Sequence, residues 1–150
     1  MNSYPHLSDT AANKLSLSNA ERIQHIKKPR WIGYDRAREI ITKLEDLLVH
    51  PRQPRMPNML IIGETNNGKT VLVSKFREKH PAEENPNGEA VNIPVLYIQA
   101  PPSPDEGAIY SAIFNRLFEN PRRGESITSK RDRVVAVLRR VNLGMIMVDE

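Results

Sequence analysis

The chain has 150 residues, of which 39% are hydrophobic, 27% charged and 5% aromatic, and it contains no cysteine. These proportions are typical of a folded domain and not of a disordered chain, and the length fits one domain. The lack of cysteine excludes disulfides, thiolate metal sites and cysteine nucleophiles. No secretory signal is visible, and no apolar stretch approaches the roughly 20 residues of a membrane helix. We therefore expect a cytoplasmic protein with no membrane partner.

The net charge of +4 is distributed unevenly, because residues 1–60 and 121–150 are basic and residues 61–120 are acidic. Basic patches bind phosphate backbones in some proteins and are plain solvated faces in others. The charge pattern alone leaves contact with nucleic acid open.

The N-terminal region divides into an arm and a short helix. Residues 1–17 are polar without periodicity and predict a flexible arm. Ser18 precedes Glu21 by three positions, which predicts a capping box at the start of a helix. Pro29 ends this helix, because proline cannot continue the backbone hydrogen bonding.

A second helix is predicted over residues 35–50, with Asp35 as N-cap. Its apolar side chains recur at spacings of three and four, which places them on one face. Three prolines then predict an extended connector: Pro51, Pro54 and Pro57.

Three short apolar runs predict strands that are buried on both faces: Met59–Ile62, Val95–Ile98 and Met145–Val148. Helical patterns separate them, over residues 71–79, from Ser103 onward, and over residues 129–141. The helix from Ser103 has a clear start signal, which consists of Ser103 as N-cap, Pro104 and Glu106. The alternation of strands and helices predicts an α/β fold with a parallel sheet.

The eight residues from Gly63 to Thr70 match the phosphate-loop pattern G-x-x-x-x-G-K-[ST] at every fixed position. Glycines allow the sharp turn and a close backbone approach to phosphate, and the following helix start supplies amide donors. Lys69 would reach the β- and γ-phosphates of a nucleotide, and the Thr70 hydroxyl would bind Mg²⁺. The predicted nucleotide-binding residues are Gly63, Glu64, Thr65, Asn66, Asn67, Gly68, Lys69, Thr70 and Val71.

The last predicted strand ends in two carboxylates, Asp149 and Glu150. Ligands of open α/β sheets bind at the carboxyl ends of the strands, so Asp149 is placed to bind Mg²⁺. Glu150 would polarise a water for attack on the γ-phosphate and, with Lys69, forms the predicted catalytic pair. A kinase for a small substrate does not need this glutamate, which disfavours that alternative.

One segment upstream of the loop allows two interpretations. Ile32, Gly33 and Tyr34 form either an adenine pocket or part of the core.

Three segments carry a family resemblance: Ile32–Ala37, Arg55–Thr70 and Val95–Gly107. The Arg-Met-Pro-Asn lead-in and the Asn66-Asn67 pair inside the loop are more specific than the general phosphate-loop pattern. With these residues the chain resembles TniB, the ATP-binding helper of bacterial transposons, in the AAA ATPase superfamily.

The resemblance implies an ATP- and Mg²⁺-dependent protein that binds DNA largely independently of sequence. It implies that the protein regulates a DDE-type transposase and its choice of target, and forms an ATP-dependent homo-oligomer. It also implies an AAA-type P-loop fold, with residues 18–57 as a helical lead-in and residues 58–150 as the nucleotide-binding core.

AAA modules continue beyond the strand that carries the metal-binding aspartate, and the next strand lies in the centre of their sheet. We therefore expect an incomplete sheet and a chain truncated from a longer ATPase, inactive by itself. The alternatives are a non-catalytic remnant, or another AAA-type P-loop ATPase of DNA metabolism.

Overall fold

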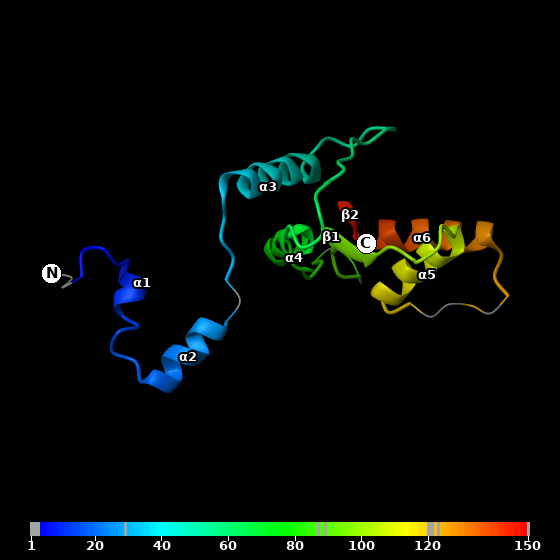
Figure 1. Cartoon of the computed structure of the whole chain (residues 1–150). Coiled ribbons are helices and arrows are strands. Elements are labelled where there is room, and N and C mark those ends of the chain that lie inside the picture. Colours follow the sequence, from blue (N-terminus) through cyan, green and yellow to red (C-terminus); the bar gives the residue numbers. More distant parts are fainter. Residues whose placement is uncertain are drawn as a thin grey trace. The chain divides into compact units, whose positions relative to one another are not determined.

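The computed structural model describes residues 4–28, 30–86, 88, 90–119, 122 and 124–149. The chain separates into two compact units, Met1–Ile32 and Gly33–Glu150. The first unit holds the helices α1 (Asp9–Ala12) and α2 (Asn19–Lys27) (Figure 1). The predicted capping box is present at α2, where the Glu21 carboxylate accepts from the Ser18 amide at 2.9 Å. The short helix α1 lies in the segment for which no helix was predicted.

The second unit contains four helices and two strands among its described residues. In chain order these are α3 (Asp35–Leu48), α4 (Lys69–Lys79), β1 (Val95–Gln99), α5 (Glu106–Arg116), α6 (Ile127–Arg140) and β2 (Met145–Asp149). Strands β1 and β2 pair in parallel, with Val95 opposite Met145 and Gln99 opposite Asp149. The structure is a mixture of helices with a small parallel sheet, as the alternating pattern predicts.

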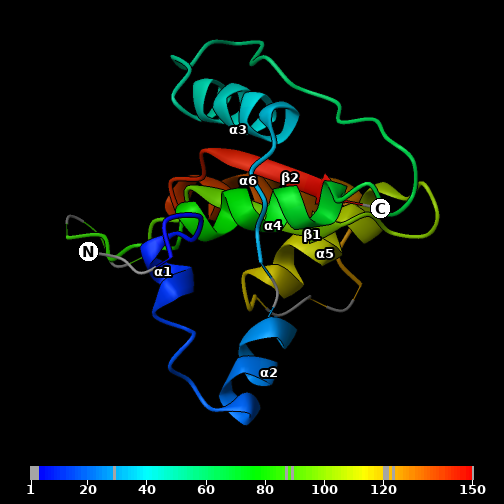
Figure 2. The same ribbon diagram turned by 60° about the vertical axis from the view of Figure 1, so that its left-hand side comes forward.

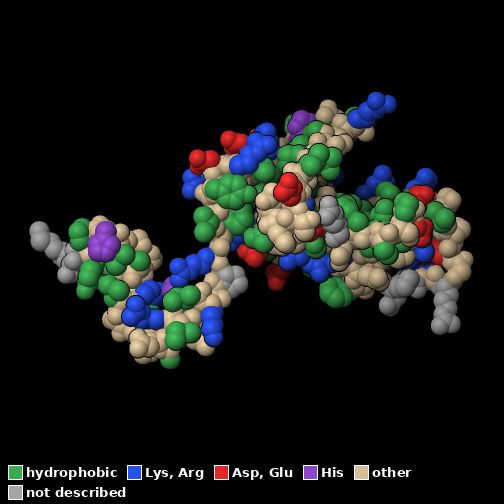
Figure 3. Space-filling model, viewed as in Figure 1, with side chains coloured by type: hydrophobic (Ala, Val, Ile, Leu, Met, Phe, Trp, Pro, Cys, Tyr) green, Lys and Arg blue, Asp and Glu red, His purple; other side chains and the backbone are tan. Residues whose placement is uncertain are grey.

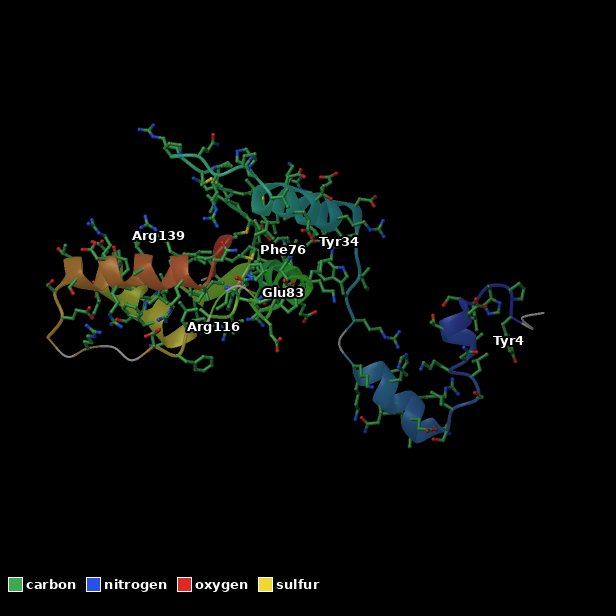
Figure 4. The ribbon with its side chains drawn as sticks, turned by 180° about the vertical axis from the view of Figure 1, so that it is seen from behind. Tyr4, Tyr34, Phe76, Glu83, Arg116 and Arg139 are labelled. Atoms are coloured by element: carbon green, nitrogen blue, oxygen red, sulfur yellow. The ribbon has the colours of Figure 1, made fainter. Side chains whose placement is uncertain are left out.

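Helices cover the sheet from both sides, so that α4 lies in front of the strands and α6 behind them in Figure 2. The apolar core behind β1 consists of side chains from β1, α5 and α6: Leu96, Ile98, Ile113, Phe114, Val134 and Val137. On the other side, α4 contributes Leu72, Val73 and the fully buried Phe76 (Figure 4). Burial of these apolar side chains stabilises both helix layers against the strands.

The prediction of a strand over Met59–Ile62 is wrong, because the segment has no regular structure. The side chains of Leu60 and Ile62 are 80% and 85% exposed. A strand needs a neighbour for its backbone hydrogen bonds, and a cavity of about 530 Å³ is lined by residues 56–61 on one side and β2 on the other. The apolar composition is that of a strand, but no segment among the described residues pairs with it.

The prediction that the strands are buried on both faces holds for β1 and is wrong for β2. In β2 Met147 is buried, whereas Ile146 and Val148 are 38% and 61% exposed. Strand β2 is an edge strand in the described sheet, since β1 pairs with it on one side and the cavity borders it on the other.

Two predicted helix caps shift by one or two residues. Tyr34, which has an extended backbone, is the N-cap of α3, so Asp35 is its first helical residue. At α5 the cap is Asp105 and not Ser103, because the Asp105 carboxylate accepts from the Gly107 amide at 2.9 Å. Helix α6 begins before the predicted residue 129, since Ser126 accepts from the Ser129 amide at 3.2 Å.

The turn into β2 requires glycine at position 144. A Cβ atom there would lie 2.8 Å from the Pro94 carbonyl oxygen and 2.7 Å from Leu48 Cδ1. The same carbonyl accepts hydrogen bonds from the amides of Gly144 and Met145, so it has little room to move.

We predict that Gly144→Ala lowers the free energy of unfolding by about 1–3 kcal/mol, because the new methyl group overpacks a fixed backbone. The matched control is Gly107→Ala, where the nearest atom to a Cβ lies at 3.4 Å, an ordinary contact. Urea unfolding followed by circular dichroism measures both variants. Equal stability of the two would contradict the prediction.

A shielded ion pair fixes the start of α6. Arg133 Nε and Nη2 donate to the two carboxylate oxygens of Glu125 at 3.1 and 2.9 Å, and the guanidinium lies 3.7 Å above the Phe114 ring. The Glu125 side chain is 5% exposed. The hydrogen bonds from Arg133 are the main cause that lowers the pKa of Glu125 below its ordinary value.

This lowered pKa gives a pH-dependent stability. The pair contributes fully above pH 4.5, the ordinary pKa of the carboxyl, and its contribution falls as the pH drops through the lower folded-state pKa. We predict that Glu125→Gln is less stable than wild type at neutral pH and that the difference narrows in acid. Thermal unfolding of both proteins, from neutral pH to below pH 4.5, measures this difference in stability. The control Asp132→Asn, in an exposed pair, should change stability by no more than about 0.5 kcal/mol at either pH.

Candidate functional site

The loop Gly63–Thr70 makes a tight turn before α4. Asn66 and Gly68 both have positive φ angles, of 66° and 77°, and Gly68 is the N-cap of α4. Glycine at the N-cap provides no side-chain hydrogen bond to this helix start. The first amides of a helix have no partner within the helix, and with the helix dipole they favour an anion.

The Lys69 side chain folds back over the loop. Its Nζ donates to the Gly63 carbonyl at 2.8 Å and to the Glu64 carbonyl at 3.2 Å. The ammonium is thereby held beside the turn, at the same end of α4 as Thr70. Helix α4 begins two residues earlier than predicted, so both side chains lie in its first turn.

Asp149 ends β2 and faces the loop, although it lies 79 positions after Thr70 in the chain. Residues 65–71 and Asp149 line one cavity of about 380 Å³. The parallel pairing places Asp149 at the carboxyl end of the sheet, and α4, which begins at the loop, packs against β1. Asp149 of the predicted carboxylate pair thus meets the predicted loop in one place.

Tyr97 and Ala100 hold Asp149 from the β1 side. The Tyr97 hydroxyl donates to Asp149 Oδ2 at 3.0 Å, and the Ala100 amide donates to the Asp149 carbonyl at 2.7 Å. Burial first, and then the hydrogen bond to Asp149, raise the pKa of the Tyr97 hydroxyl. The hydroxyl therefore stays protonated, and a donor, at neutral pH.

The cavity offers oxygen ligands suited to Mg²⁺. Thr70, which carries a hydroxyl, and Asp149, which carries a carboxylate, both belong to its lining. Among the described residues, no three His, Cys, Asp or Glu side chains cluster to hold a metal by themselves. Mg²⁺ in phosphate sites takes one or two protein oxygens and completes its shell with phosphates and water, so this donor set fits.

The three residues predicted for the adenine pocket, Ile32, Gly33 and Tyr34, do not all belong to the same unit. Tyr34 lines a separate cavity of about 570 Å³ together with Gly63 and Lys69, so it lies next to the loop. Gly33 does not line this cavity, and Ile32 belongs to the N-terminal unit and is 78% exposed. Only Tyr34 of the three is brought to the loop within the second unit.

Glu150, the predicted hydrolytic carboxylate, lies outside the described residues.

Basic side chains on α6 are partly engaged in ion pairs within the unit, since Arg133 pairs with Glu125 and Arg140 with Glu119. Figure 3 shows acidic and basic side chains side by side over α3, where Arg36 pairs with Glu39 at 2.9 Å. These faces therefore present mixed charge.

Sequence reasoning missed Tyr97 as part of this site, because it placed the residue in a buried apolar strand. The available signal was a polar tip in an apolar run, since a phenol hydroxyl in the interior usually finds a partner. Identifying that partner required the register of β1 against β2.

No helix in the part of the chain that the structure describes is long and apolar enough to cross a membrane. No curated protein matches the chain. The family model of the bacterial TniB protein matches residues 22–150, which is most of the chain and includes the loop and both strands. The chain therefore belongs to the TniB family, whose members are associated with transposition.

Proposed function

We propose that the chain binds ATP with Mg²⁺ and acts as a nucleotide-dependent helper of DNA transposition. In this role it binds DNA and regulates a DDE-type transposase and its choice of target, as an ATP-dependent homo-oligomer. The observation that carries the proposal is the single cavity of about 380 Å³ lined by residues 65–71 and Asp149. A phosphate loop and a carboxylate in one cavity are the protein groups that a nucleotide with its metal needs.

Each group has a separate part in binding. The first turn of α4 would donate amide hydrogens to phosphate oxygens, and Lys69 would exchange its bonds to the Gly63 and Glu64 carbonyls for a phosphate. Thr70 and Asp149 would hold Mg²⁺, which neutralises phosphate charge when it is bound with the nucleotide.

We expect this chain to bind nucleotide without efficient hydrolysis. Among the described residues that line the cavity, Lys69 is the one cation. Phosphoryl transfer gains much of its rate from a further positive group, such as an arginine, at the developing charge. Glu150 stays a prediction as the hydrolytic carboxylate.

DNA contact rests on the family and on charge. The basic regions, residues 1–60 and 121–150, would meet the phosphate backbone, which is attracted independently of base sequence. This part of the proposal therefore predicts strong salt dependence.

We predict that Lys69→Ala weakens ATP binding about 10- to 100-fold, because it removes a charged hydrogen-bond donor to phosphate. The matched control is Lys75→Ala on the same helix, where the ammonium pairs with Glu78 at 3.0 Å and does not line the cavity. Isothermal titration calorimetry measures both. Equal affinities for the two variants would refute the nucleotide site.

For the DNA function, we predict that Mg²⁺ and ATP together strengthen binding to duplexes of unrelated sequence, and that Lys69→Ala abolishes this increase. Fluorescence anisotropy at several salt concentrations measures the effect. Equal DNA affinity with and without ATP would contradict a nucleotide-controlled helper, even if ATP itself binds.

A further inference from the structure

The geometry around Asp149 points to one more residue of the site. Tyr97 lies opposite Met147 in the parallel register, and Asp149 follows two positions later on β2. Because side chains alternate between faces along a strand, Met147 and Asp149 project from the same face. The tyrosine ring spans the step between the two positions, and its hydroxyl reaches Asp149 Oδ2 at 3.0 Å.

The tyrosine ring is itself held by the helix that follows the loop. The Arg77 guanidinium on α4 lies 5.5 Å from the centre of the Tyr97 ring, within the range of a cation–π contact. Helix α4 also carries Lys69 and Thr70 in its first turn. A chain of contacts therefore connects the loop helix, through Tyr97, to the carboxylate at the end of β2.

We propose that Tyr97 is a positioning residue, whose hydroxyl orients the Asp149 carboxylate toward the Mg²⁺ of a bound nucleotide. The proposal rests on the proposed function, because it concerns the same metal. A hydrogen bond at one oxygen fixes the plane of a carboxylate and the directions of its lone pairs. Outer partners of this kind orient metal ligands and contribute strongly to metal affinity.

Asp149 is also held by a hydrogen bond of its main chain. The Ala100 amide fixes the Asp149 carbonyl at 2.7 Å, so the backbone of this residue is anchored independently of its side chain. Loss of the Tyr97 hydroxyl should therefore change the direction of the carboxylate without moving the strand. A purely structural role would need only the ring, which phenylalanine retains.

The test is Tyr97→Phe, with Tyr110→Phe as the matched control. The Tyr110 hydroxyl also donates to a carboxylate, that of Glu106 on α5, and Tyr110 does not line the cavity. ATP affinity is measured by calorimetry in EDTA and then over a range of Mg²⁺ concentrations. The quantity compared is the Mg²⁺ concentration at which half of the Mg²⁺-dependent increase in ATP affinity is reached.

We expect Tyr97→Phe to raise this concentration about tenfold and to leave ATP affinity in EDTA unchanged. Tyr110→Phe should stay within about twofold of wild type in both measurements. In Asp149→Asn, adding Tyr97→Phe should have no further effect, because the hydroxyl acts through that carboxylate.

Two results would overturn the inference. Either Tyr97→Phe behaves as Tyr110→Phe does, or it weakens ATP binding in EDTA as much as in Mg²⁺, which would mean that the hydroxyl acts on the loop. These differ from failure of the proposed function, in which Lys69→Ala and wild type bind ATP equally and both proposals fall.

If circular dichroism shows that Tyr97→Phe is unfolded, the wild-type chain provides a second reading. The chain has four tyrosines, which isotope labelling makes visible by NMR. Adding Mg²⁺ to the ATP-saturated protein should shift one tyrosine resonance, and Asp149→Asn should abolish that shift. No shifted tyrosine resonance would overturn the inference.

Discussion

The parallel pairing of β1 with β2 is the constraint on which the rest of the second unit depends. It joins residues 95–99 to residues 145–149, and without it neither helix layer would have a common surface to cover. Asp149, at the end of the ladder, shares a cavity with the loop Gly63–Thr70, although Thr70 lies 79 positions earlier in the chain. The candidate site therefore depends on two features, the backbone ladder that places Asp149 and the packing of α4 against β1 that places the loop.

In the described part of the sheet, one edge of β2 has no strand beside it and borders a cavity. Ile146 and Val148 face outward there, and Leu60 and Ile62 are exposed on the segment across the cavity. Apolar side chains at an unpaired strand edge favour association with other chains. This edge therefore favours self-association of the protein at high concentration.

Local signals in the sequence predicted much of this structure. Sequence patterns identify features that depend on residues close together in the chain. Examples are the capping box at Ser18, the strand at Val95 and the loop at Gly63. The strand at Met59 was wrong, since a strand depends on a neighbour that its own residues do not encode. The pairing of Tyr97 with Asp149 was missed for a related reason, because only the strand register brings the two together.

The position of Lys69 has a consequence for the thermodynamics of ligand binding. Its ammonium is already fixed by two carbonyl oxygens of the loop, so much of its rotational freedom is lost when the chain folds. A lysine side chain carries about 2 kcal/mol of such entropy. A phosphate that replaced these two hydrogen bonds would therefore cost less side-chain entropy than one that ordered a free lysine. The loop is in this sense preorganised by its own lysine.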